Sequence, residues 1–285
     1  MGENKVKNQH TNPKVYLKNF HSRVVIPENP KKRKKYFLFV FDKDENSIIE
    51  KKTDKISYEK EFYNLMSEKQ EIEIILSKSE NDYSPISKKI IQDESLSNLS
   101  EDEKENLINF ITFQILRSKY TREIIKEIPK KLKEEVCDKC SENLREKLDN
   151  AKEPENIRKT QNRIILDFEN YKKYLQDKRI ILIKNKTTLP FITSDNPARL
   201  WNCCGVEGGI ETEGAVIEFP LSPYLMINFC CPIHFQNNPK IFELKDEEKV
   251  SLQWKIYFKE CFNELYSSIR ELDKLKGINF NQNAK

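Results

Sequence analysis

Short apolar runs bounded by turn-forming residues lie towards both ends of the chain and predict β-strands there. Residues 36–42, YFLFVFD, form such a run, and the Asp-Lys-Asp-Glu-Asn stretch that follows favours a turn into a second short strand. Within residues 179–231 the pattern predicts a hairpin of RIILIKN with PFITS, followed by a strand pair of GAVIEF with YLMINFCC. We therefore expect sheet on both sides of the middle of the chain.

Residues 58–177 show helical spacing instead. Ser100 and Glu103 match a capping box, in which each side chain accepts a hydrogen bond from the backbone N–H of the other residue, so a helix is predicted to begin there. The apolar positions that follow recur at intervals of three and four residues: Leu107, Phe110, Ile111, Ile115 and Leu116. We expect this helix to lie in the core.

The next stretch, residues 126–178, is highly charged and amphipathic, and Pro154 is predicted to interrupt it because proline does not fit a helix interior. Apolar positions within residues 245–271 indicate a return to helix. Strands that flank a helical middle favour an α+β fold with a mostly antiparallel sheet. We expect residues 1–285 to form a single domain, with residues 126–178 as a charged helical insertion within it.

Composition narrows the functional classes. The net charge of +4 over 285 residues is too small to indicate nucleic-acid binding by itself. A run of about 20 apolar residues, which a membrane span requires, is missing from the sequence, and so is the apolar centre of a secretory signal. We therefore expect a cytoplasmic protein with no membrane partner. The basic loop PKKRKK could contact phosphate, although such runs are usually just solvated.

The cysteine pattern fits reduced thiols. Seven Cys include two adjacent pairs, Cys203-Cys204 and Cys230-Cys231, and adjacent cysteines rarely bond to each other. Cys137 and Cys140 form the sole CxxC, and no histidine lies at zinc-finger spacing from them. We expect ordinary surface cysteines there rather than a structural zinc site.

Two polar residues interrupt the core-helix pattern. Gln114 and Arg117 are three residues apart, so they share one helix face with apolar neighbours. Burying an amide and a guanidinium is unfavourable unless both find partners. The pair therefore predicts either a structural ion pair or hydrogen bond that fixes the helix to the sheet, or a pocket in which Arg117 binds an anion.

A histidine precedes an apolar anchor near the N-terminus. His10 lies just before Val15, Tyr16, Leu17 and Phe20, which should hold the segment in place. Because the pKa of histidine is near neutrality, His10 is a candidate acid or base. The alternative is a histidine hydrogen-bonded to the backbone.

The segment PFITSDNP brings several polar residues to the end of a predicted strand. Ser194, Asp195 and Asn196 follow Phe191 and Ile192, and Pro197 favours an extended conformation at Asn196. An aspartate at a strand end commonly makes a local turn. The alternative is a rigidly held polar group that meets a ligand.

Several of these motifs together resemble those of a known protein family. QHxxPxxYLxxF near the N-terminus, the Gln114/Arg117 helix, FITSDNP and FPLSP at 219–223 resemble the mainly prokaryotic domain-of-unknown-function 4238 family over essentially the whole chain. Asn12 stands where a hydrophobic residue is common in such sequences. SENDYSPISKKII resembles a further family stretch that points to Glu80. The resemblance implies one domain whose recurring polar positions are His10, Glu80, Gln114, Arg117 and Asp195, and it implies no reaction.

Two functions of different class follow. In the first, the protein is a phosphodiesterase or nuclease acting on nucleic acid or a nucleotide, with His10 as general acid or base and with Glu80 and Asp195 holding Mg²⁺ or Mn²⁺ or orienting His10. Arg117 would neutralise phosphate, and the remaining polar residues would position substrate: Gln114, Ser194 and Asn196. This hypothesis expects His10, Arg117 and Asp195 to lie within roughly 10 Å of one another.

In the second, the protein is a non-catalytic binding or scaffold module of a prokaryotic defence or stress system. The same polar residues would then form a structural network, and the charged helices of residues 126–178 would face a protein partner.

Overall fold

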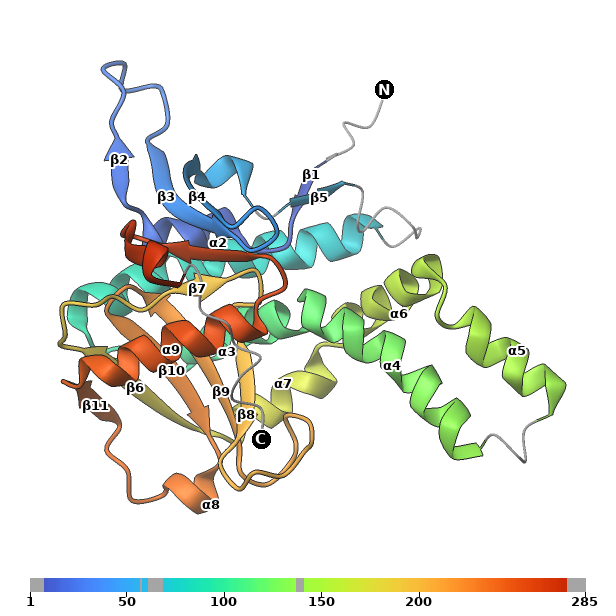
Figure 1. Ribbon diagram of the computed structural model, residues 1–285. Coiled ribbons are helices and arrows are strands. Elements are labelled where there is room, and N and C mark those ends of the chain that lie inside the picture. Colours follow the sequence, from blue (N-terminus) through green and yellow to red (C-terminus); the bar gives the residue numbers. More distant parts are fainter. Residues whose placement is uncertain (1–7, 57, 61–68, 137–140, 276–285) are drawn as a thin grey trace.

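The computed structural model describes residues 8–56, 58–60, 69–136 and 141–275, and within them two sheets lie between layers of helices (Figure 1). The first sheet has the order β2-β3-β12-β7, with β4 paired to β3 beside this path. Its strands are β2 (Arg23–Val25), β3 (Lys35–Asp42), β4 (Ser47–Lys52), β7 (Thr193–Ser194) and β12 (Glu264–Ser267). All of its pairings are antiparallel.

The second sheet has the order β11-β6-β10-β9-β8. Its strands are β6 (Arg179–Asn185), β8 (Arg199–Asn202), β9 (Ala215–Ser222), β10 (Leu225–Cys230) and β11 (Ile241–Leu244). The β11–β6 pairing is parallel and the others are antiparallel. A small ladder of β1 (Asn8–His10) with β5 (Tyr58–Lys60) lies apart from both sheets.

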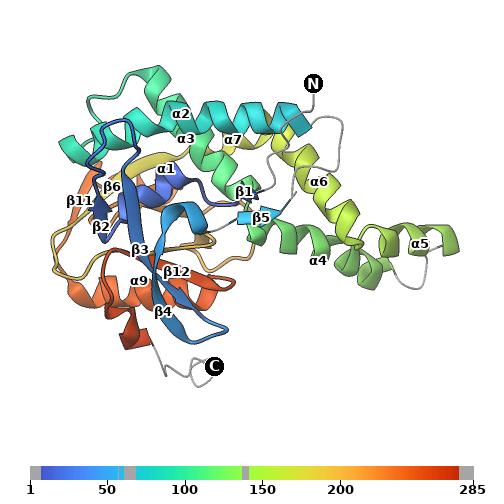
Figure 2. The ribbon, with the colours of Figure 1, turned by 90° about the horizontal axis from the view of Figure 1, so that it is seen from above.

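Helices cover this β layer on two sides (Figure 2). One side carries α2 (Lys69–Asp93), α3 (Glu101–Leu116) and α7 (Glu169–Gln176), and the other carries α9 (Glu247–Glu260). Side chains alternate along β10 accordingly: Ile227 packs in the core shared with α2 and α3, whereas Met226 packs with α9. The short elements are α1 (Lys14–Leu17), α8 (Pro232–Phe235) and the 3₁₀ turns Lys18–Phe20, Thr53–Lys55 and Glu271–Leu275.

An arm of helices projects from this body: α4 (Lys119–Val136), α5 (Glu142–Asn150) and α6 (Pro154–Leu166) (Figure 1). The arm starts with α4 at Lys119, whereas the charged stretch noted in the sequence spans residues 126–178 and also includes α7. Pro154 stands in the first turn of α6, where its missing N–H leaves no bond unmade. Among the described residues, no helix is long and apolar enough to cross a membrane.

The α+β class with mostly antiparallel strands is confirmed, and so is the Ser100–Glu103 capping box. The hairpin of RIILIKN with PFITS is wrong, because β6 pairs with β10 and β11 while Thr193–Ser194 pairs with β12 in the other sheet. The helix expected over residues 245–271 ends at Glu260, and Leu265 lies in β12. In both cases long-range pairing prevails over the local pattern.

Candidate functional site

Residues 190–197 cross from one sheet to the other, and α9 holds one side of this segment. Trp254 Nε1 donates to the Pro190 carbonyl at 2.7 Å. The Gln253 amide bonds the backbone of Ile192 twice: Nε2 donates to its carbonyl at 2.8 Å, and Oε1 accepts its N–H at 3.3 Å. A buried edge segment whose backbone is satisfied by side chains in this way has a fixed conformation.

The N-terminal motif holds the other side of the same segment. Tyr16 Oη lies 2.7 Å from Thr193 Oγ1 and donates to the Pro220 carbonyl at 2.9 Å. Asn12 Nδ2 donates to the Ser194 carbonyl at 2.7 Å, and the Tyr16 ring packs 4.9 Å from that of Phe219. Burial raises the pKa of Tyr16 well above its ordinary value, so the hydroxyl keeps its proton. The motifs QHxxPxxYLxxF, FITSDNP and FPLSP therefore meet in the core.

The Asp195 carboxylate accepts hydrogen bonds from the backbone of the α9–β12 connection. Its Oδ1 accepts the N–H of Phe262 at 3.0 Å, and its Oδ2 accepts the N–H groups of Asn263 and Glu264 at 2.8 and 3.2 Å. Burial raises the pKa of the carboxyl, although these N–H groups and the charge of Lys119 oppose the rise. A carboxylate with three backbone donors fixes the end of α9 onto the segment.

Ser194 and Asn196 form a local turn beside Asp195. Ser194 Oγ accepts the Asn196 N–H at 3.0 Å and donates to the Asn196 carbonyl at 2.9 Å. Asn196 Oδ1 is buried, and no hydrogen-bond partner for it is found in the part of the chain that the structure describes. Asn196 lines a cavity of about 510 Å³, whose wall also includes Glu123 and Glu260.

Arg117, Gln114 and Glu80 form one closed network between α2 and α3. Arg117 Nη1 donates to Glu80 Oε1 at 3.1 Å, while its Nε and Nη2 donate to Gln114 Oε1 at 3.3 and 3.0 Å. Gln114 Nε2 lies 3.4 Å from the Phe110 carbonyl one turn earlier. Each nitrogen of the buried guanidinium thus has a partner within the chain, which satisfies a charge that burial would otherwise leave unpaired.

The sequence-derived candidates therefore divide between two places. Glu80, Gln114 and Arg117 lie together, and Ser194, Asp195 and Asn196 lie together on the cross-sheet segment. The backbone of His10 pairs with Tyr58 in the β1–β5 ladder, and its side chain lies outside the described residues, so its expected approach to Asp195 stays a prediction. Cys137 and Cys140 also lie outside the described residues.

A groove runs along the first turns of α4, and its first cavity is apolar whereas the two cavities that adjoin it have mixed polar and apolar linings. It consists of adjoining cavities of about 340, 670 and 510 Å³, and Tyr120 and Leu200 line all of them. Apolar side chains from α4, α6, α7 and the β8–β9 region line the first of these cavities, among them Ile124, Ile164, Tyr171 and Ile210. The Asn196 cavity forms one end of this groove.

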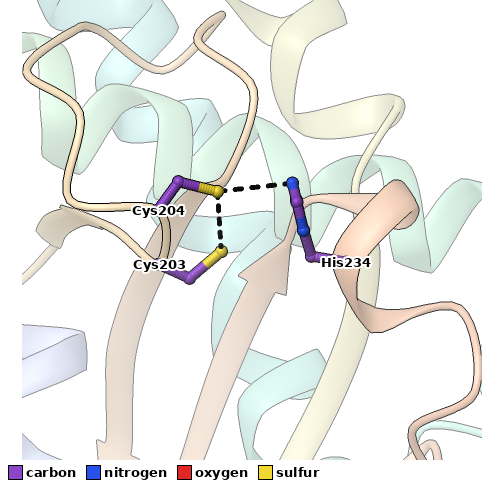
Figure 3. A group of neighbouring side chains, drawn as sticks. All are labelled: Cys203, Cys204 and His234. Carbon is purple, nitrogen blue, oxygen red and sulfur yellow. Dashed lines mark hydrogen bonds between the residues drawn. The ribbon is translucent and has the colours of Figure 1, made fainter.

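Sequence reasoning missed one group of metal-ligating side chains. Cys203, Cys204 and His234 present their donor atoms within 4.8 Å of one another at one edge of the second sheet (Figure 3). The sequence places Cys203-Cys204 after β8 and His234 after β10, but it carries no signal that these two strands flank β9 and so bring the three side chains together.

Comparison with known proteins gives one match. The model of the family described as "Protein of unknown function (DUF4238)" matches residues 8–271. Neither the curated proteins nor the solved structures contain a match to the chain.

Proposed function

The chain belongs to the DUF4238 family, as its motifs indicated, and we propose that it is a non-catalytic protein-binding module. In this account the family's polar residues hold the sheets and helices together. The groove beside α4 binds an amphipathic helix of a partner protein.

The observation that carries the proposal is a row of exposed apolar residues along α4. Tyr120, Ile124, Ile128 and Leu132 recur every four residues and keep 43, 42, 50 and 44% of their surface exposed. Residues at this interval form a continuous ridge on a helix surface, here about 18 Å long at 1.5 Å per residue. An apolar ridge of this length on a projecting arm is typical of a surface that another element covers.

The shape of the groove favours a helix as the occupant. Tyr120, Ile124 and Ile128 of the ridge line the apolar cavity together with Ile164 of α6 and with Leu200 and Ile210 of the β8–β9 region. Charged side chains of both signs stand at the margins, including Lys131 and Glu207. An apolar cavity with a mixed polar rim matches helix-in-groove recognition, in which residues of one helix face provide the anchors.

The phosphodiesterase or nuclease hypothesis draws support from residue types alone. Glu80 and Asp195, its metal-binding or histidine-orienting carboxylates, are engaged by Arg117 and by backbone N–H groups. Both oxygens of Asp195 accept backbone N–H groups, so Asp195 would have to give up such a bond in order to bind Mg²⁺ or Mn²⁺. The contacts therefore favour the structural role, in which neither carboxylate has to change partner.

Site-specific photocrosslinking tests the binding proposal. A benzophenone amino acid placed at position 124 or 128 should give the same discrete protein adduct in cells, whereas position 252, an equally exposed leucine site on α9, should not. The identified partner, purified and mixed with the purified chain, should bind directly, and Ile124→Glu should weaken its Kd by at least tenfold, equivalent to about 1.4 kcal/mol.

Three outcomes would contradict the proposal. They are adducts that contain a second copy of this chain alone, an affinity that Ile124→Glu leaves unchanged, and Mg²⁺- or Mn²⁺-dependent cleavage of labelled RNA or DNA that is lost in a folded Asp195→Asn variant. Leu252→Glu is the matched control for the affinity measurement.

A further inference from the structure

Cys203, Cys204 and His234 form a compact set of sulfur and nitrogen donors. Cys203 Sγ lies 3.9 Å from Cys204 Sγ, and Cys204 Sγ lies 3.4 Å from His234 Nε2 (Figure 3). All three residues are solvent-exposed, so an ion can reach them without any rearrangement of the core.

The topology of the second sheet brings these residues together. β8 and β10 each pair antiparallel with β9, so they run in the same direction and end at the same edge of the sheet. Cys203 and Cys204 follow β8 directly, and His234 lies in α8, the short helix that follows β10. Cys204 and His234 are 30 positions apart in sequence, and they meet because β8 and β10 end on either side of β9.

The loop that carries the cysteines is held in shape by its own contacts. Asn202 Oδ1 accepts the Cys204 N–H at 2.8 Å, and Asn202 Nδ2 donates to the Glu213 carbonyl at 2.7 Å. Gly214 has a φ of +82°, and a methyl group there would lie 2.8 Å from Cys204 Sγ. The backbone that carries Cys204 is thus held in place before any ligand arrives.

Two of the three donor separations match those of a tetrahedral metal site, and the third is within 4.8 Å. Bonds of 2.3 Å to sulfur and 2.0–2.1 Å to nitrogen place two sulfur ligands about 3.8 Å apart and a sulfur and a nitrogen ligand about 3.6 Å apart. The observed 3.9 and 3.4 Å lie close to these values. Thiolate with imidazole is a ligand set that favours Zn²⁺, whereas Mg²⁺ and Mn²⁺ favour oxygen ligands.

We propose that Cys203, Cys204 and His234 bind a Zn²⁺ ion. Glu213 Oε1 lies 3.1 Å from His234 Nε2 but outside the set of donor atoms that lie within 4.8 Å of one another, so the fourth position is left to water. On binding, the two thiols release their protons to solvent and the histidine binds as neutral imidazole. The ion fastens the β8–β9 loop to α8, and this loop also supplies Val206 and Gly209 to the lining of the groove beside α4. The inference holds whether or not that groove binds a partner.

The competing interpretations are a pair of free thiols and a disulfide between the adjacent cysteines. The sulfur atoms are not bonded, and a disulfide would need them to approach to about 2.05 Å. Free thiols would make the two contacts ordinary hydrogen bonds, and metal titration distinguishes that interpretation from a metal site.

Cobalt substitution tests the proposal on the full chain. The reduced, chelator-treated protein is titrated with Co²⁺, then with Zn²⁺, and folding is followed by circular dichroism. We expect thiolate-to-cobalt charge-transfer absorption and the intense visible bands of tetrahedral cobalt, saturating at about one ion per chain and bleached by Zn²⁺. Cys204→Ser and His234→Ala should each weaken Zn²⁺ binding more than about 100-fold, since even outer-shell partners of a metal contribute 10–100-fold.

The Cys137→Ser/Cys140→Ser double variant is the control, and it should bind Zn²⁺ like the unmodified chain. The proposal is overturned if no charge-transfer band forms, if the control variant loses the ion, or if folded Cys204→Ser binds Zn²⁺ as tightly as the unmodified chain. Glu213→Gln should cause a smaller loss than either ligand variant.

Discussion

Arg117 Nη1 lies 3.1 Å from Glu80 Oε1, and this pair joins α3 to α2 at a point where the arginine side chain is 2% exposed and the glutamate side chain 32%. Gln114 completes the arrangement from within α3. Both residues lie in the stretches by which the sequence resembles the family, and here the pair links two helices that cover the second sheet.

Arg117→Ala should lower the free energy of unfolding by about 2–5 kcal/mol, because it truncates a side chain that is only 2% exposed and leaves the buried Gln114 carbonyl without its donor. Urea denaturation followed by circular dichroism measures the loss. Lys78→Ala removes an exposed ion pair with Asp82 on the same helix and should change stability by less than about 1 kcal/mol. If Arg117→Ala is as stable as the parent, Arg117 has no structural role and is instead a candidate for binding a ligand.

Asp195→Asn should be destabilising by about 1–3 kcal/mol. The three N–H groups use both carboxylate oxygens, so an amide must turn its NH₂ towards at least one of these donors. Asp42 is a matched control, because its Oδ1 accepts both N–H groups of its turn, and Asp42→Asn should stay within about 0.5 kcal/mol. Equal effects of the two substitutions would make Asp195 an ordinary turn residue.

Tyr16→Phe should cost about 1–3 kcal/mol of stability, since the Pro220 carbonyl loses its buried donor and Thr193 loses its partner. Thermal melting of the variant measures this, and Tyr224→Phe, at a site 48% exposed, provides the comparison. If the two variants have the same melting temperature, the Tyr16 hydroxyl does not stabilise the contact between the N-terminal motif and the cross-sheet segment.

Ile124→Glu should leave stability nearly unchanged, within about 0.5 kcal/mol, because the side chain is already 42% exposed. Chemical denaturation of the purified variant gives this value. A large loss would show that the α4 ridge serves the fold itself.

Local signals in the sequence predicted the parts of the fold that local chemistry determines. The capping box at Ser100 and Glu103 forms as its spacing requires, and Gln114 bonds Arg117 because residues three apart share a helix face. The concentration of polar residues at 194–196 marked a position of structural importance. The nature of that importance depends on Phe262, Asn263 and Glu264, which are more than 60 residues away in sequence.

The remaining features depend on pairings that no local pattern encodes. Thr193 and Ser194 continue an apolar run after a turn-like stretch, and this pattern is the same whether the partner strand is β6 or β12. Cys204 and His234 are neighbours because β8 and β10 flank β9, and the strand order is fixed by the packing of the whole sheet. Motif spacing could reveal neither relationship.

The central claim is that polar residues such as Asp195 stabilise the fold, whereas the groove beside α4 binds a partner protein. The affinity for that partner tests the claim most directly. The affinity of the crosslinked partner is measured by calorimetry for Asp195→Asn and Ile124→Glu, at a temperature where both variants are folded. We predict that Asp195→Asn binds with the parent's Kd to within about twofold and that Ile124→Glu binds at least tenfold more weakly. The reverse result, with binding lost in folded Asp195→Asn and kept in Ile124→Glu, would contradict the account.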